Sequence, residues 1–199
     1  MDFSKFKYAY ALSGGIGSGK SSVCQILSSM RYEIIDADKI AHGLLEKKKQ
    51  EIVGEFGLTI LSEGKISRAK LGRIVFDEPA KLQKLNQILS FDIQREIYQQ
   101  CLELEEKKNP FFVEIALLFE LRESYNFKQT ILIFCSKEEQ IKRVCQRNGL
   151  SLDEVEKRID SQMSLEKKLP LAWSVIENNG SEDELKQKIR QWLRDKNLF

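Results

Sequence analysis

Gly14-Gly15-Ile16-Gly17-Ser18-Gly19-Lys20-Ser21 is the stretch that decides the fold of this chain of 199 residues. Its spacing, G-x-x-x-x-G-K-S, is that of a phosphate-binding loop. The glycines allow the backbone to curl around a phosphate with its N–H groups pointing inward. Lys20 can reach the β- and γ-phosphates, and the Ser21 hydroxyl is suited to Mg²⁺. The stretch therefore predicts a site for a nucleoside triphosphate and its metal ion.

The flanks of this loop support a phosphate site over a simple glycine-rich turn. Residues 8–12 are apolar and predict a strand, whereas residues 22–27 begin a helical pattern. A strand–loop–helix arrangement places the partial positive charge of a helix N-terminus at the phosphate. A chance match to the loop together with both flanks is rarer than a chance match to the loop alone. We therefore interpret the stretch as a phosphate-binding site.

Composition bounds the class of protein. The chain is 42% hydrophobic, carries a net charge of +2 and contains four cysteines and one histidine. The charge is too weak to predict nucleic-acid binding. With no C-x-x-C spacing and only His42 as histidine, neither a zinc site nor a disulfide framework is expected. No apolar run approaches the ~20 residues that span a membrane. Residues 1–7 lack a signal-peptide pattern, so we expect a cytoplasmic protein.

Strand and helix patterns alternate outside one segment. Strands are expected at residues 8–12, 32–35, 111–113, 130–135 and 174–177, and helices at residues 20–30, 39–47, 137–147, 152–162 and 182–195. The apolar runs are continuous, as in strands that are buried on both faces. The fold class is therefore α/β, with a parallel sheet that is flanked by helices.

Residues 48–109 interrupt this alternation and read as helical, with no expected strand. Their apolar residues recur every three or four positions, which predicts one long amphipathic helix or two joined ones: Leu82, Leu85, Leu89, Ile93, Ile97, Cys101 and Leu104. We interpret the stripe as core packing. An insertion at this point of the chain would lie over the carboxyl ends of the strands, where open α/β folds bind ligands.

A second irregular segment carries arginines. Arg143, Arg147 and Arg158 flank a break at residues 149–151. Alone, they would be interpreted as a solvated helix face. Beside a triphosphate they predict a lid whose cations stabilise a phosphoryl group in transfer.

Acidic residues follow two of the expected strands. Asp36 and Asp38 come after the second strand, and Glu114 ends the third. A carboxylate at the first position can accept a proton from an attacking hydroxyl or help to hold Mg²⁺, although one of the two aspartates is expected to cap a helix. For Glu114 two alternatives stay open: it orients a water on Mg²⁺, or it is a solvated strand end.

The whole set resembles the dephospho-CoA kinase family over nearly the entire chain. The resemblance is carried, in order, by residues 11–23, 35–42 (I-D-A-D-K-I-A-H), 68–76, 117–120 (L-L-F-E), 140–147, 158–163 and 175–180. The chain departs from the family where Ala116 replaces a usual Pro, where Ser90-Phe91 replaces a frequent His-Pro, and where Trp173 replaces a usual Asp.

The resemblance implies a P-loop kinase core with a helical acceptor-binding insertion and an arginine-bearing lid. The core is expected at residues 1–47, 110–142 and 166–199, the insertion at 48–109 and the lid at 143–165. Transfer of the ATP γ-phosphate to the ribose 3′-hydroxyl of dephospho-CoA is implied, with ATP and Mg²⁺ required. Closure of the insertion and the lid is expected to exclude water.

The resemblance also assigns roles to residues. Asp38 becomes the general base, and Lys20 and Arg143 stabilise the transferring phosphoryl group. Acceptor binding falls to Asp38 and to three further residues, His42, Arg68 and Glu120. ATP is bound by Gly14, Gly15, Ile16, Gly17, Ser18, Gly19, Lys20, Ser21, Ser22, Arg147, Asn178 and Asn179, and Ser21 is the metal ligand.

Three other classes of function remain to be weighed: another small-molecule P-loop kinase, a nucleotide-driven switch, and a non-catalytic interaction module built on residues 48–109. The chain has no Asn-Lys-x-Asp guanine tetrad, which argues against the commonest switch. The complete phosphate loop argues against the interaction module. We expect a small molecule as the partner, with no nucleic acid or membrane. The oligomeric state is open and compatible with a monomer.

Overall fold

The computed structural model describes residues 1–198, without the side chains of residues 76 and 77. The chain divides into two units. The core unit comprises Asp2–Asp36 and the chain from Gln100 onward, and the insertion unit comprises Ala37–Gln99 together with Met1. Each unit is described by itself.

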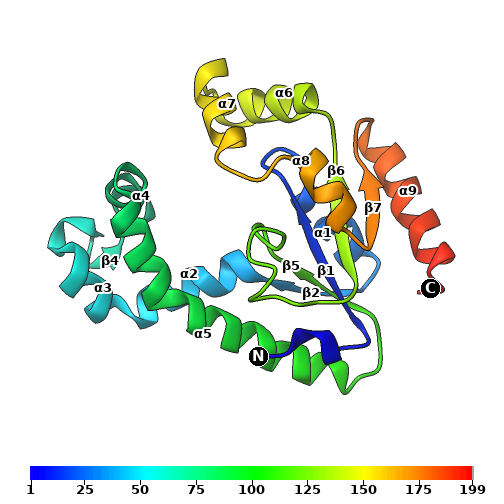
Figure 1. Ribbon diagram of the computed structural model, residues 1–199, viewed down its shortest axis with the longest axis horizontal. Helices are drawn as coiled ribbons and strands as arrows, with labels where there is room; N and C mark the ends of the chain where they lie inside the picture. Colours follow the sequence, from blue (N-terminus) through cyan, green and yellow to red (C-terminus); the bar gives the residue numbers. More distant parts are fainter. Residues whose placement is uncertain (199) are drawn as a thin grey trace. The chain divides into compact units, whose positions relative to one another are not determined.

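The core unit is built on a five-stranded sheet of order β2-β5-β1-β6-β7 (Figure 1). All its neighbouring strands are parallel. The strands are β1 (Ala9–Gly14), β2 (Glu33–Asp36), β5 (Phe111–Glu114), β6 (Thr130–Phe134) and β7 (Ser174–Glu177). This confirms the predicted parallel sheet, and β1 lies at its centre because its residues pair with β5 on one side and with β6 on the other.

Helices and loops cover both faces of this sheet. The helices of the core unit are α1 (Lys20–Ser29), α6 (Lys137–Asn148), α7 (Leu152–Asp160), α8 (Leu165–Lys168) and α9 (Glu182–Asp195), with short 3₁₀ turns at Phe3–Lys5 and Leu169–Leu171. The side chains of α6 and α7 pack mainly against each other and Ile16. Ile131 and Ile133 of β6 pack in a cluster with side chains of α1 and α9. Leu132, between them, packs with Phe119 and Leu165 in a different cluster. Because successive strand residues point to opposite faces, the continuous apolar run of β6 fills both layers.

The insertion unit is mainly helical. It contains α2 (Ala37–Lys47), α3 (Lys49–Phe56), a 3₁₀ turn at Leu58–Ile60, α4 (Arg68–Asp77) and the first part of α5 (Pro79–Glu105), which continues into the core unit. The unit begins at Ala37, and Leu44 of α2 packs in the same cluster as Ile52 and Leu89. The insertion expected at residues 48–109 lies largely within this unit, and its exact bounds stay a prediction.

The expectation that this segment holds no strand is wrong. Two antiparallel two-residue strands, β3 (Leu61–Ser62) and β4 (Lys65–Ile66), form a hairpin. Both turn residues have positive φ, 51° at Glu63 and 75° at Gly64. Strands this short contain no detectable alternation of apolar and polar residues, which is why the sequence pattern does not reveal them.

The arginine-bearing segment folds as two capped helices. The helix α6 ends at Gly149, whose φ of 62° is left-handed, and α7 begins with a capping box between Ser151 and Glu154. The hydrogen bonds from Ser151 lower the pKa of Glu154. These local signals explain the break between the two helices.

Within the described residues, no helix is long and apolar enough to cross a membrane.

Candidate active site

The phosphate-binding loop joins β1 to α1 at the carboxyl edge of the sheet. Gly14 is the last residue of β1, and Gly19 is the N-cap of α1. Gly17 and Gly19 adopt left-handed conformations, with φ of 76° and 92°. A Cβ at Gly19 would lie 2.1 Å from the Nδ2 atom of Asn178, so a side chain at this position would overlap its neighbour. The glycines therefore provide both the curvature and the close approach that the motif predicts.

Asn178 and Asn179 already make contacts within the core unit. Asn178 is buried, and its Nδ2 donates a hydrogen bond of 2.8 Å to the carbonyl of Ser18 in the loop. Asn179 Oδ1 accepts a hydrogen bond of 2.8 Å from the N–H of Ser136, the N-cap of α6. One amide thus supports the phosphate-binding loop, and the other supports the helix that carries Arg143.

Two cationic side chains lie beside this loop, Lys20 at the start of α1 and Arg143 on α6. Lys20 Nζ lies 3.4 Å from the carbonyl oxygen of Gly15. Arg143 pairs through Nε with Glu139 at 3.3 Å, and its Nη1 atom would lie 3.8 Å from a Cβ at Gly19. The same Nη1 is buried and has no hydrogen-bond partner among the described residues, as has the Ser18 hydroxyl. Buried polar atoms are normally paired, so this arrangement fits an anionic ligand such as a polyphosphate.

The other residues expected to bind ATP differ in their environments. Ser21 is exposed in the first turn of α1, and Ser22 behind it is half-buried. Arg147 is exposed on α6, and its Nε donates to Asn148 Oδ1 at 3.0 Å. Ile16 is held through its backbone by two glutamine side chains, which the sequence pattern did not single out.

Asp36 and Glu114 lie next to each other at the edge where the loop begins. They are register partners on β2 and β5, and Glu114 also pairs with Leu12 of β1. Cys24, one turn into α1, donates its thiol to Glu114 Oε2 at 3.3 Å. Burial raises the pKa of Cys24, and the Glu114 carboxylate raises it further, so the thiol remains a donor. The sequence predicted only a packing role for this cysteine.

In the insertion unit, one pocket of about 290 Å³ brings together Asp38, His42 and Arg68. Arg68 Nη1 lies 3.1 Å from His42 Nδ1. The rest of the lining is mainly apolar: Ala41, Leu45, Leu71, Gly72, Val75, Leu82, Leu85 and Leu89. Part of the helical stripe that was interpreted as core packing therefore forms the wall of this pocket. The combination of a carboxylate, a guanidinium and an apolar wall suits a ligand with both charged and apolar parts.

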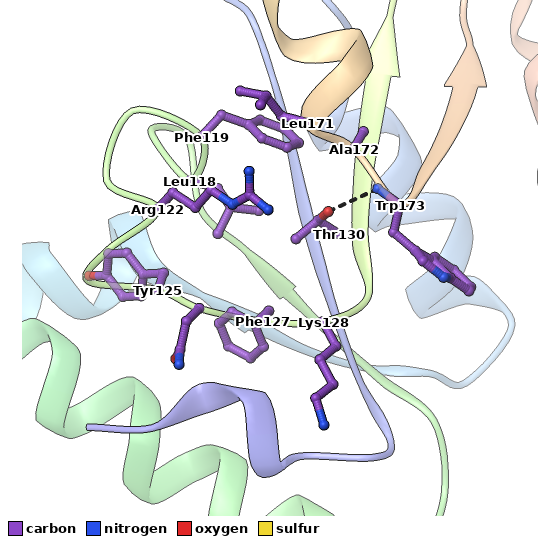
Figure 2. Close-up of a pocket in the computed structure, with 11 residues that line it drawn as sticks. Leu118, Phe119, Arg122, Tyr125, Phe127, Lys128, Thr130, Leu171, Ala172 and Trp173 are labelled. Carbon is purple, nitrogen blue, oxygen red and sulfur yellow. Dashed lines mark hydrogen bonds between the residues drawn. The ribbon is translucent and has the colours of Figure 1, made fainter.

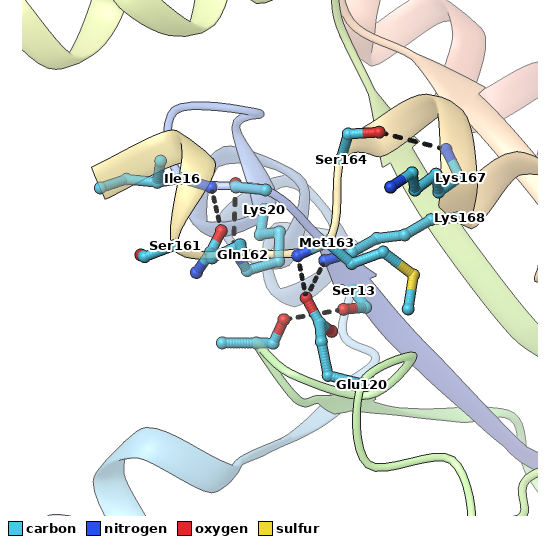
Figure 3. A network of polar contacts seen from close by, with 12 residues as sticks. Ser13, Ile16, Lys20, Glu120, Ser161, Gln162, Met163, Ser164, Lys167 and Lys168 are labelled. Atoms are coloured by element: carbon cyan, nitrogen blue, oxygen red, sulfur yellow. Dashed lines mark hydrogen bonds and ion pairs between the residues drawn. The ribbon is translucent and has the colours of Figure 1, made fainter. Parts of the chain in front are cut away.

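Glu120 does not line that pocket. It belongs to the core unit, where its Oε1 atom accepts a hydrogen bond from the N–H of Met163 at 3.1 Å. The same oxygen forms an ion pair of 2.8 Å with Nζ of Lys168, and a dashed line marks this pair in Figure 3. Lys168 could not be predicted from the sequence, because no local pattern links it to Glu120.

Trp173 lies away from the phosphate-binding loop, at the amino end of β7. Its N–H donates to Thr130 Oγ1 at 3.1 Å, a contact drawn in Figure 2. The centres of the Trp173 and Trp192 rings are 6.5 Å apart. It lines a separate cavity of about 410 Å³ between the loop that follows β5 and the segment before β7. Since parallel strands place their amino ends opposite the phosphate loop, the departure at Trp173 does not touch the loop.

Comparison with protein families gives one match that covers most of the chain. The family model described as dephospho-CoA kinase matches residues 8–184. A dephospho-CoA kinase of Wolinella succinogenes is 42% identical over 187 residues, which is 94% of this chain and 93% of that protein. One of Helicobacter pylori is 36% identical over 190 residues, covering 94% of this chain and 97% of that protein.

Solved structures show the same similarity. TT1252 from Thermus thermophilus superposes with a TM-score of 0.81 at 33% identity, covering 96% of this chain and 98% of that one. The dephospho-CoA kinase from Campylobacter jejuni has a TM-score of 0.68 at 33% identity, with coverages of 94% and 96%. A shikimate kinase from Acinetobacter baumannii, at 19% identity and a TM-score of 0.50, shares the fold.

Proposed function

This chain belongs to the dephospho-CoA kinase family, and on that premise we propose which of its residues bind ATP, bind the acceptor and carry the transfer. The enzyme transfers the γ-phosphate of ATP to the ribose 3′-hydroxyl of dephospho-CoA, the last step of coenzyme A synthesis. Membership of this family decides against a kinase for a different acceptor, a nucleotide-driven switch and a non-catalytic module.

ATP is bound by the loop from Gly14 to Gly19, with Lys20 on the β- and γ-phosphates and Ser22 behind them. Arg143 contributes positive charge at the transferring group, and its unpaired, buried Nη1 beside the loop supports this role. Arg147 is a second cation of the same helix. We propose Asn178 and Asn179 as adenine contacts, each through the amide atom that makes no hydrogen bond within the described part of the chain.

The Ser21 hydroxyl would hold Mg²⁺ together with the ATP phosphates, and the ion would supply positive charge that offsets the negative charge of those phosphates. The donor set is suited to this ion, because Asp36 and Glu114 add carboxylate oxygens at the edge of the sheet from which the loop starts. These carboxylates would orient water molecules around the metal. Cys24 holds Glu114 in place by donating to Oε2.

The observation that carries the acceptor assignment is the pocket where Asp38, His42 and Arg68 meet. Asp38 accepts the proton of the 3′-hydroxyl while that oxygen bonds to the γ-phosphorus and ADP leaves. Arg68, positioned by its contact with His42, binds an anionic phosphate of the acceptor. The leucine wall takes an uncharged part of the same molecule.

The wider setting of the enzyme stays a prediction. We propose that it acts in the cytoplasm on small molecules, without nucleic acid or membrane, and that a monomer suffices.

Asp38→Asn tests the assignment, with Asp183→Asn as a matched control. Both aspartates stand in the first turn of a helix, so both variants lose a similar favourable interaction with the helix dipole. With ATP, Mg²⁺ and dephospho-CoA, only Asp38→Asn should lose turnover, by about 10²–10⁴-fold, at unchanged ATP affinity. The 3′-phosphorylated product is measured by mass. Turnover of Asp38→Asn close to that of the control would refute the base assignment.

A further inference from the structure

A buried ion pair joins two distant parts of the core unit. Glu120 belongs to the loop that follows β5, and Lys168 is the last residue of α8. Their side chains are 2.8 Å apart, with exposed fractions of 20% for Glu120 and 0% for Lys168. In Figure 3 the Lys168 side chain extends toward Glu120 alongside the backbone of Met163. The contact is therefore made almost entirely out of water.

This pair is not what stability alone would favour. Burying an ammonium group and a carboxylate is costly unless their remaining hydrogen-bonding atoms are also satisfied. Among the described residues, Glu120 Oε2 and Lys168 Nζ are both buried without a hydrogen-bond partner. The only polar contact of Nζ in this part of the chain is the ion pair with Glu120 Oε1. An apolar pair of similar volume would give equal or greater stability. What the charged pair adds is a fixed position for the groups that it contacts.

The group fixed in this way is the peptide of Met163. Its N–H donates to Glu120 Oε1, the same oxygen that faces Lys168. The loop carrying Glu120 is itself tied to β1, because the Ser13 hydroxyl donates to the carbonyl of Ala116 at 3.1 Å. The peptide of Met163 is thereby anchored to the strand that leads into the phosphate-binding loop.

Gln162, the residue before Met163, continues this connection into the loop. Its Oε1 atom accepts a hydrogen bond of 3.0 Å from the N–H of Ile16. The carbonyl of Ile16 accepts one of 2.7 Å from Nε2 of Gln140 on α6. Both backbone groups of Ile16 are thus held by glutamine side chains: Gln140 lies on α6 before Arg143, and Gln162 lies just after α7.

We propose that Glu120 and Lys168 are positioning residues for ATP, acting through the peptide of Met163 and the side chain of Gln162 on the backbone of Ile16. The inference rests on the proposed function, in that the loop from Gly14 to Gly19 is taken to bind the ATP phosphates. It revises the role of Glu120 from the acceptor side to the ATP side. Lys168 and Gln162 join the set of residues that shape the loop.

Two double variants separate positioning from stability. Glu120→Gln with Lys168→Met removes both charges but keeps an acceptor for the N–H of Met163. Glu120→Met with Lys168→Met removes both charges and that acceptor. Because neither leaves a buried charge alone, both should remain folded in the absence of denaturant. The variant without the acceptor should unfold at a somewhat lower urea concentration than the other, because the N–H of Met163 loses its partner.

The readout is the dissociation constant of ATP, measured by calorimetry on the whole protein. The variant without the acceptor should bind ATP about fivefold more weakly, the equivalent of one hydrogen bond, and the variant that keeps it should bind as the wild type does. Equal ATP affinity in the two variants would overturn the proposal. If the variant with two methionines does not fold, Gln162→Ala carries the same expectation, and unchanged ATP affinity in it would also overturn the proposal.

The acceptor provides the second readout. The KM for dephospho-CoA should be the same in both double variants and in the wild type. A raised KM for dephospho-CoA at unchanged ATP affinity would return Glu120 to the acceptor side and contradict the proposal. Failure of the proposed function would look different, because the wild type would then form no coenzyme A while the differences in ATP affinity could still be measured.

Discussion

Replacing Gly17 by alanine tests how closely the phosphate-binding loop is packed. Gly17 has a φ of 76°, and a Cβ there would lie 2.8 Å from the backbone oxygen of Gln140 and 2.8 Å from a methyl carbon of Val144. Gly64, in the β3–β4 turn, has a nearly identical φ of 75°, but a Cβ there would meet nothing within 4 Å. Alanine would be strained at the φ of either glycine, but of the two only Gly17 has close neighbours.

The magnitudes follow from this difference. A left-handed conformation costs a residue with a Cβ roughly 1 kcal/mol, and Gly64→Ala should lose about that much unfolding free energy. In Gly17→Ala the new methyl group must also displace the backbone of α6 or the loop, which costs about 1–3 kcal/mol more, as in an overpacked core. The expected loss is therefore about 2–4 kcal/mol for Gly17→Ala.

Urea denaturation gives the two unfolding free energies, and calorimetry gives the ATP affinity of each variant under native conditions. Gly17→Ala should also bind ATP more weakly, since the displaced loop no longer aims its N–H groups at one point, whereas Gly64→Ala should bind as the wild type does. Equal losses of stability in the two variants, with equal ATP affinities, would refute the close approach of α6 to the loop.

Three further outcomes are expected. Gly54→Ala should raise the unfolding free energy by about 0.5–1 kcal/mol, because Gly54 lies inside α3 with open space around it; an unchanged urea midpoint would contradict this. At pH 8 a thiol reagent should label half-buried Cys145 first, and mass spectrometry should show the three buried cysteines unreacted until the protein unfolds. These are Cys24, Cys101 and Cys135, and burial raises the pKa of Cys135 to about 11. Lys48 lowers the pKa of Asp92, so their ion pair stabilises the fold above the carboxyl's unfolded pKa and this contribution is lost as pH falls through the lower folded value. The stability difference between the wild type and Asp92→Asn should accordingly vanish in acid, and a difference that persists there would disprove the assignment.

The parts of this structure that could be predicted from sequence are those with local signals. The glycine spacing of residues 14–21 predicts a phosphate loop, and the apolar runs at β5 and β6 predict buried parallel strands. The arginine-bearing helices are bounded by Ser151 and Gly149, which are ordinary capping residues. Asp38, His42 and Arg68 could be grouped through the family resemblance, and the structure places all three in one pocket.

The parts that could not be predicted depend on contacts between distant residues. Nothing near Lys168 in the sequence indicates that its ammonium group meets Glu120, or that Gln162 reaches the backbone of Ile16. Similarly, the periodicity of α5 predicts an apolar face but not that Leu82 and its neighbours leave a pocket open beside Arg68. Side-chain periodicity reports which face is buried, whereas a cavity depends on how completely the facing elements fill it.

The central place of β1 has a consequence for how the chain folds. This strand is made first, yet its residue Ala9 pairs with Phe111, and Ala11 pairs with Thr130. The insertion unit must therefore be synthesised before β1 can pair with β5 or β6. Until then the apolar residues of β1 are unpaired. The chain must lose the conformational entropy of closing this long loop before contacts between the strands stabilise the sheet. We therefore expect the sheet to form late and slowly, and the unpaired residues of β1 to be the part of the chain most prone to aggregation before it forms.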